Sequence, residues 1–250
     1  VRLADATEIR ARVVLANTDP KRTFLQLVGD AHLDADFAAD MRAFRAESGT
    51  FRMNLALNGL PEFAALPGPG IAPQHRSFIR LIGSIDEMEA AWLAARRGEL
   101  PPVPIIDAVI PTALDDSLAA PGCHVLSLLC QHYPYKLSGG RSWDELRETA
   151  AERIIDRVAD FVPNIRRILV GRQAMSPLDL ERIFGLTGGD VYHGRLDPDQ
   201  LFSLRPHPKA AQYRTPIAGL YLCGAGAHPG GGVSGAPGYN CARRVLKDLR

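Results

Sequence analysis

The chain contains several short segments in which hydrophobic and polar residues alternate. The clearest is the segment 51–57, where Phe51, Met53, Leu55 and Leu57 fall on one face of an extended chain. Strict alternation of this kind predicts a half-buried β-strand. Apolar runs and alternation predict further strands at residues 9–15, 78–82, 105–110, 123–132, 165–170 and 220–223.

Other segments place hydrophobic residues on one face of a helix. Ser84 and Ser142 each stand three positions before a glutamate, Glu87 and Glu145, which is the pattern of a capping box at a helix N-terminus. We therefore expect helices at residues 85–97 and 142–161, and others at 20–28, 34–46, a short stretch from 177, and 239–249. Because amphipathic helices and strands occur in mixed order, the sequence predicts an α+β fold in which a mixed sheet is screened by helices.

A glycine-rich segment follows the last predicted strand. Seven glycines fall between Gly224 and Gly238, and most of the side chains between them are small. Glycine lacks a Cβ atom, so backbone N–H groups in such a loop can approach a bulky ligand closely. With the strand before it and the helix N-terminus after it, the loop has an arrangement suited to phosphate or a polar cofactor.

Three catalogued motifs fail at specific positions of this loop. A dinucleotide fingerprint needs glycine where Pro229 stands, and the phosphate loop of nucleoside triphosphatases needs a lysine that the segment lacks. The nucleophile elbow of hydrolases fits residues 232–236 except at the last position, which is Ala236. A serine hydrolase that uses Ser234 therefore stays an alternative, as does a glycine-rich turn that binds no ligand.

Composition narrows the class of protein. The 250 residues are 46% hydrophobic and 23% charged, which is ordinary for a soluble globular protein, and the net charge of +1 provides no electrostatic basis for binding nucleic acid. The four cysteines show no Cys-x-x-Cys spacing, which favours buried free thiols in a reducing compartment and a cytoplasmic protein. The chain starts at Val1 and no targeting segment is evident, so we expect it to be a piece of a longer protein.

Three segments carry a resemblance to a known family. Residues 220–225, Leu-Tyr-Leu-Cys-Gly-Ala, together with the His-Pro-Gly-Gly-Gly-Val of residues 228–233, resemble the C-terminal motif of the phytoene desaturase-like flavoproteins. Residues 13–20 resemble that family's strand, which ends in an Asn-Ala-Asp-Pro-like turn. Residues 188–206 resemble the subgroup close to the pyridine nucleotide-disulfide oxidoreductase domain-containing protein 2. The three segments span the chain, whereas the middle matches only in outline.

The resemblance implies that the chain is the C-terminal portion of an FAD-dependent oxidoreductase. In that family an N-terminal Rossmann unit holds FAD, a middle region covers the substrate, and the glycine loop returns to the flavin. It implies segments of a Rossmann-like FAD-binding domain at residues 1–19 and 210–250, and a substrate domain at residues 20–209. The cofactor contacts that it implies are Gly224, Ala225, Gly226, His228, Gly230, Gly231, Gly232, Val233 and Ser234. Among these, residues 230–232 are expected to come closest to the flavin ring.

The chain departs from the family in one respect, because it has no N-terminal glycine fingerprint. We therefore expect its partner to be the N-terminal FAD-binding half of the same protein, and the isolated chain to lack both FAD and activity. The expected reaction of the whole protein is the removal of hydride from an organic, apolar small molecule. In such enzymes the flavin carries the redox step, and no constellation of acid, base or nucleophile is found, so the catalytic residues are left unassigned.

Two histidines lie in the segments that carry the resemblance. His193 and His228 each stand near glycine, where a histidine is more often a hydrogen-bonding partner of the backbone than a catalytic base. No metal site is expected. A non-catalytic interaction module would need an exposed apolar patch or a basic face, and the sequence shows neither plainly. Peripheral membrane contact and the oligomeric state are left open.

Overall fold

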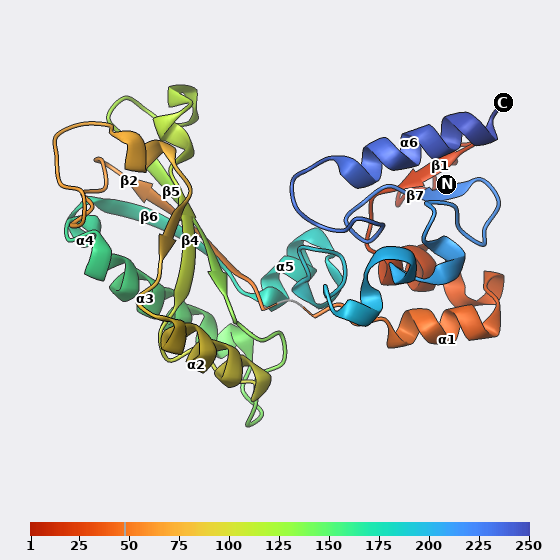
Figure 1. Ribbon diagram of the computed structural model, residues 1–250, viewed down its shortest axis with the longest axis horizontal. Coiled ribbons are helices and arrows are strands. Elements are labelled where there is room, and N and C mark those ends of the chain that lie inside the picture. Colours follow the sequence, from red (N-terminus) through yellow and green to blue (C-terminus); the bar gives the residue numbers. More distant parts are fainter. Residues whose placement is uncertain (48) are drawn as a thin grey trace. The chain divides into compact units, whose positions relative to one another are not determined.

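The computed structural model describes residues 1–47 and 49–250, and the chain divides into two compact units. Unit 1 combines Val1–Glu47 with Gly185–Arg250, and unit 2 is Ser48–Phe184 (Figure 1). Residues 20–47 and 185–209, which the resemblance assigns to the substrate domain, pack in unit 1 with the two ends of the chain. The boundary between compact units therefore lies inside the region expected for that domain.

Unit 2 is built on a five-stranded sheet in the order β3-β4-β5-β2-β6, and each neighbouring pair is antiparallel. Its strands are β2 (Phe51–Leu57), β3 (Ile79–Leu81), β4 (Ile105–Val109), β5 (His124–Gln131) and β6 (Leu169–Met175). Met53 on β2 lies opposite Leu128 on β5, and both side chains are fully buried. Because side chains alternate along a strand, Arg52 and Leu129 point to the other face.

Helix α3 (Trp143–Phe161) packs on the buried face of this sheet (Figure 1). Its N-terminus carries the predicted capping box, since the Glu145 backbone N–H donates to Ser142 Oγ at 3.3 Å and the Ser142 N–H donates to Glu145 Oε2 at 3.1 Å. Arg157 of α3 forms an ion pair of 2.7 Å with Glu87 of helix α2 (Ile85–Arg96). The two predicted capped helices therefore both belong to unit 2.

Unit 1 contains a two-stranded parallel sheet of β1 (Val14–Ala16) and β7 (Leu220–Leu222). Helix α6 (Ala236–Asp248) lies beside these strands (Figure 1), where its Cys241 and Val245 pack with Tyr221. A second cluster joins α1 (Ala35–Ala43) to the π-helix Arg22–Gly29, with the rings of Phe24 and Phe37 edge to face at 4.9 Å. Both clusters bring residues of the N-terminal and C-terminal segments together.

The predicted α+β class is confirmed, and parallel and antiparallel pairs both occur, in separate sheets. The strand predicted at 165–170 is wrong at its start, because α4 (Ile165–Ile168) precedes β6. Ile165 and Ile168 are both buried three residues apart, which suits one helical turn. The last helix begins at Ala236 rather than at residue 239, because Pro237 fits the first turn, where no helical N–H bond is needed.

Two further helix boundaries depend on single residues. The helix predicted at 34–46 ends at Ala43, because Phe44 leaves the helical region with ψ at 124° and buries its ring. The helix predicted at 20–28 is present and continues to Gly29, whose φ of +86° marks the break. The remaining short helices are α5 (Pro177–Phe184) in unit 2 and several 3₁₀ turns. No helix in residues 1–47 and 49–250 is long and apolar enough to cross a membrane.

Candidate functional site

The glycine loop connects β7 to α6 within unit 1. It begins where the Cys223 N–H donates to the carbonyl of Ala16 at 3.0 Å, which extends the pairing of β1 and β7 by one residue. Gly230, Gly232 and Gly235 have φ values of +107°, +99° and +68°. Residues other than glycine rarely adopt such backbone φ values. The loop conformation therefore favours glycine at these three positions on backbone grounds alone, most strongly at Gly230 and Gly232.

Other glycines of the loop are required by packing inside unit 1. A Cβ atom at Gly224 would lie 2.6 Å from Asn17 Oδ1, and one at Gly226 would lie 2.4 Å from Cδ of Pro20. A Cβ atom at Gly231 would lie 2.1 Å from Cδ1 of Tyr192. The clearance that glycine provides at these positions is thus already filled by the chain itself.

The open part of the loop is its second half. A Cβ atom built at Gly232 or at Gly235 meets nothing within 4 Å, and Val233 and Ser234 between them are exposed. Gly230 lies deeper, because a Cβ atom there would come within 3.2 Å of Arg205 Nε. Of the three consecutive glycines expected to face a flavin, only Gly232 presents free space. The assignment of these residues to a cofactor stays a prediction.

The buried side chain of Arg205 is hydrogen-bonded to the glycine loop. Its side chain is fully buried, and its guanidinium makes six hydrogen bonds to five backbone carbonyls. Two of them go to Ala225 in the loop, at 3.1 Å from Nε and 2.9 Å from Nη2. The others go to Tyr192, Gly194, Arg195 and Gln200. One cation therefore fixes the glycine loop against the segment 192–200, and burial lowers the pKa of its guanidinium.

Two buried carboxylates lie in the same part of unit 1. Asp19 accepts from the Arg22 N–H at 2.9 Å and from the hydroxyl of Thr187 at 2.9 Å, so it caps the π-helix and ties it to residue 187. Asp190 accepts from the Tyr192 N–H at 2.9 Å through Oδ1. Burial raises the pKa of the Asp190 carboxyl. Its Oδ2 atom is buried without a hydrogen-bond partner among the described residues.

The two histidines of the resembling segments are also incompletely bonded. Nδ1 of His193 and Nδ1 of His228 are buried, and neither has a hydrogen-bond partner within the described part of the chain. The backbone hydrogen bonds expected for these rings are therefore absent at Nδ1. His193 has a φ of +59°, and burial lowers the pKa of its imidazole. The ring of His228 lies 6.1 Å from that of Phe202.

Buried polar atoms without partners concentrate near the glycine loop. Four such side-chain atoms occur among residues 1–47 and 49–250, and three of them belong to Asp190, His193 and His228. Native proteins satisfy nearly all buried polar groups, so each exception calls for a specific explanation. A ligand that offers hydrogen-bonding atoms to this part of unit 1 would supply one.

Ser234 does not have the surroundings of a hydrolase nucleophile. Its hydroxyl is exposed and accepts from the Ala236 N–H at 3.2 Å, where it helps to start α6. Within the described residues no hydrogen bond joins it to a histidine or a carboxylate. An activated serine needs such a base within reach.

Groups of three or more metal-ligating side chains are not found in the described residues.

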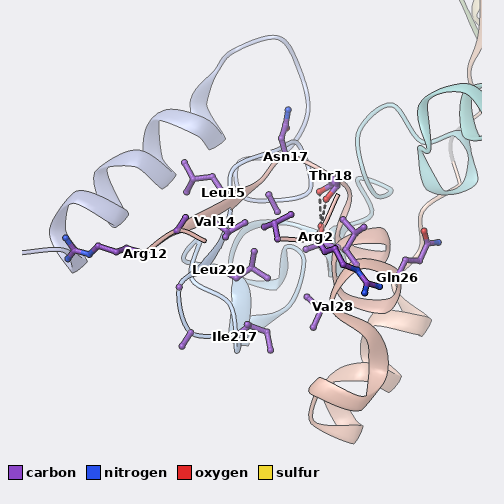
Figure 2. Close-up of a pocket in the computed structure, with 17 residues that line it drawn as sticks. Arg2, Arg12, Val14, Leu15, Asn17, Thr18, Gln26, Val28, Ile217 and Leu220 are labelled. Atoms are coloured by element: carbon purple, nitrogen blue, oxygen red, sulfur yellow. Dashed lines mark hydrogen bonds between the residues drawn. The ribbon is translucent and has the colours of Figure 1, made fainter. Parts of the chain in front are cut away.

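A cavity of about 650 Å³ lies beside β1 in unit 1 (Figure 2). Its walls come from the N-terminal residues, β1, the π-helix Arg22–Gly29 and the turn that precedes β7, with Val14, Ile217 and Leu220 among its apolar residues. Thr18 lies in its wall, where its hydroxyl is 2.6 Å from that of Thr23. Sequence patterns did not indicate this cavity, because its walls come from segments about 200 residues apart.

The outer edge of β1 borders this region. β1 pairs with β7 on one side, no second strand pairs with it among the described residues, and the Leu15 side chain is 51% exposed. Parallel strands normally lie in larger sheets that are covered on both faces. Unit 1 therefore presents a free parallel-sheet edge next to a cavity.

Comparison with known proteins shows which longer proteins this chain is similar to. The chain is 42% identical to the pyridine nucleotide-disulfide oxidoreductase domain-containing protein 2 of Rattus norvegicus over 99% of this chain and 44% of that protein. The homologues of this chain include that rat protein and phytoene desaturase-like proteins. One of the latter is the phytoene desaturase (lycopene-forming) of Pseudescherichia vulneris, 26% identical over 100% of this chain and 48% of that protein. The resemblance stated from the sequence is confirmed.

Other comparisons agree with this relationship. A limonene dehydrogenase polypeptide of Castellaniella defragrans is 26% identical over 96% of this chain and 45% of that polypeptide. The crystal structure of an oxidoreductase from Methanosarcina mazei matches the fold with a TM-score of 0.52 at 16% identity, over 98% of this chain and 44% of that one. No protein-family model matches the chain. The chain spans less than half the length of these relatives.

Proposed function

We propose that this chain forms the C-terminal part of an FAD-dependent oxidoreductase and contributes its glycine loop to the cofactor site. The observation that carries the proposal is the cluster of unpartnered buried atoms on Asp190, His193 and His228 in the unit that also holds the open loop 232–235. Homology to oxidoreductases supports an enzyme of this class.

The residues of unit 1 fit such a cofactor. The backbone of residues 232–235 is open, and it leads directly into α6, whose N-terminal N–H groups favour negative charge. His228 could donate or accept at its unpartnered Nδ1, and Gly232 allows close approach. When bound, the flavin would supply the hydride acceptor. The chain's own part would be to orient the ring and to keep water from it.

The rest of the cofactor site would come from the N-terminal half of the same protein. The free edge of β1 can accept a further strand, and the cavity beside it can accept side chains from that half. The curated relatives are more than twice as long as the part that this chain matches, which supports a second half of this kind. On this proposal the isolated chain binds no FAD and has no activity.

Unit 2 would serve as the substrate region, and the substrate would be a small organic molecule from which hydride is removed. The support is its large sheet, which carries α3 on one face and leaves the other partly exposed. The four cysteines are free, which is in keeping with a reducing, cytoplasmic setting.

The proposal is tested with Val233→Glu in the full-length protein that contains this chain. Val233 is fully exposed between two open glycines, so the change should leave the stability of unit 1 intact. It should weaken FAD binding about ten-fold, or about 1.4 kcal/mol, because the new carboxylate would stand against an anionic cofactor. Flavin absorbance after gel filtration measures the occupancy.

The matched control is Val170→Glu on β6, another exposed valine, for which full flavin content is expected. Equal flavin content in the two variants would show that the loop is not part of the cofactor site. The variant Gly231→Val is unsuitable for this purpose, since it would collide with Tyr192 whether or not a cofactor is bound.

A further inference from the structure

The sheet of unit 2 has one face that does not carry α3, and this outer face is polar. Its central positions are Arg52 and Asn54 on β2, Ser127 and Leu129 on β5, and Gln173 on β6. They face the same side because Arg52 lies opposite Leu129, while Asn54 lies opposite both Ser127 and Gln173. All of these side chains are partly or fully exposed.

Three hydrogen bonds link these side chains across the sheet. Nη2 of Arg52 donates to Ser127 Oγ at 3.0 Å, Ser127 Oγ donates to Asn54 Oδ1 at 2.8 Å, and Asn54 Nδ2 donates to Gln173 Oε1 at 3.3 Å. Arg52 sets the direction of this series of hydrogen bonds, since a guanidinium can only donate. The network therefore holds Arg52 in one orientation on the outer face.

Arg52 is a half-buried cation with no anion to balance it. No carboxylate among the described residues lies within ion-pair distance of its guanidinium, whereas Arg147 and Arg157, the other half-buried arginines of unit 2, each have carboxylate partners. Partial loss of hydration makes such a charge costly unless it is paired. A ligand that carries an anionic group would balance it.

Among the described strand residues, a single carboxylate shares this face, and it is already neutralised. Asp107 on β4 lies two strands from Arg52, with Leu129 between them, which is about 9.6 Å at the usual strand spacing. It accepts from Arg80 at 2.7 Å and from Gln131 at 2.5 Å. The outer face therefore keeps the net positive charge of Arg52.

Apolar side chains flank the cation. Leu129 stands opposite Arg52 on one side, and Met175 stands opposite it on β6 on the other. Because Met175 is buried and Leu129 is half-buried, an organic molecule could place an anionic group on Arg52 and its carbon skeleton against Leu129. The amides of Asn54 and Gln173 would meet further polar atoms.

From this arrangement we infer that the substrate is an organic anion, a carboxylate or a phosphate ester, bound through Arg52 on the outer face of the unit 2 sheet. The inference rests on the proposed function in taking unit 2 as the substrate region. It replaces the wholly apolar substrate that the family resemblance implies with one that carries a charged group. Arginine suits both anions, because its planar donors match their paired oxygens.

The experiment measures binding of three probes to the 250-residue chain by titration calorimetry. The probes are hexanoate, hexyl phosphate and the neutral hexanol, at low ionic strength. We expect one or both anions to bind and hexanol not to bind. Arg52→Gln should weaken anion binding roughly ten-fold or more, the range of a charge-assisted hydrogen bond, and Arg52→Lys should retain part of the affinity. The stronger of the two anions identifies the substrate's charged group.

The matched control is Arg167→Gln, which removes an exposed arginine from α4 and should leave binding unchanged. The inference is overturned if neither anion binds the unaltered chain, if hexanol binds as well as the anions, or if Arg52→Gln and Arg167→Gln behave alike. In the full-length protein Arg52→Gln should keep its full flavin content. A loss of flavin there would place Arg52 in the cofactor site instead and also overturn the inference, whereas a flavin-free parent protein would refute only the proposed function.

Discussion

Replacement of Arg205 by methionine is expected to release the glycine loop from the rest of unit 1. Methionine fills much of the same volume but donates no hydrogen bond, so five backbone carbonyls lose the donor that the guanidinium supplies. A buried polar group that is left without its hydrogen bond costs about 1–3 kcal/mol, so the loss of several of these bonds together should cost about 4 kcal/mol. Whole domains are stable by only about 5–15 kcal/mol. The substitution should therefore remove a large fraction of the stability of unit 1.

Hydrogen–deuterium exchange resolved by peptide is the assay, because both tryptophans, Trp92 and Trp143, lie in unit 2 and fluorescence would not report on unit 1. A cost of about 4 kcal/mol raises the population of the open loop by roughly three orders of magnitude. Faster exchange is expected for residues 192–200 and 223–232, and unchanged exchange for β2 and β5 in unit 2.

Two control variants sharpen this test. Arg205→Lys keeps the charge but cannot reach all five carbonyls, so its exchange should be intermediate. Arg195→Met removes a half-exposed arginine of the same segment, paired with Asp197, and such surface pairs contribute about 0–1 kcal/mol. Unchanged exchange at residues 223–232 in Arg205→Met would refute the view that Arg205 holds the loop.

Three further outcomes follow from individual contacts. Burial lowers the pKa of His193 in unit 1 and of His132 in unit 2 from 6.5, so the unfolded chain takes up protons first and stability is lost as the pH falls below about 6.5. Both residues have positive φ, which asparagine tolerates. His193→Asn should reduce the acid sensitivity of exchange in unit 1 alone. His132→Asn should reduce it in unit 2 alone, where His124, whose pKa is also lowered by burial, retains part of it. Gly231→Ala should cost about 1–3 kcal/mol through contact with Tyr192, and the added change Tyr192→Ala should restore part of it in a double-mutant cycle of denaturation midpoints. Ser142→Ala should cost unit 2 about 1 kcal/mol by removing the cap of α3, measured by urea denaturation followed by tryptophan fluorescence.

Local patterns predicted the elements whose environment is uniform along their length. Alternation identified β2 because every second side chain meets the same core, and the capping box identified α3 because it satisfies helix donors from neighbouring residues. The short apolar run at 165–170 could not be assigned in the same way, since one helical turn and a short strand bury similar residues. α4 and β6 divide that run between them.

The candidate site was predicted only in part, because much of it depends on contacts between distant segments. Glycine content pointed to the loop, but it could not separate Gly231, which is glycine because Tyr192 occupies the space, from Gly232, which is open. Arginine is a residue that is normally exposed, so no sequence pattern marked Arg205 as fully buried. Its five carbonyl partners converge only once the loop and residues 192–200 have folded together.

We propose that this chain supplies one part of a flavin site that the N-terminal half of the protein completes. The most direct measurement is gel filtration of FAD with this chain alone, with the N-terminal half alone, and with both produced as separate polypeptides, followed by flavin absorbance in each protein peak. We expect this chain alone to carry no FAD, and the two halves together to form a complex that retains FAD more fully than the N-terminal half by itself. Failure of the two halves to associate, with equal FAD retention by the N-terminal half in either case, would contradict it.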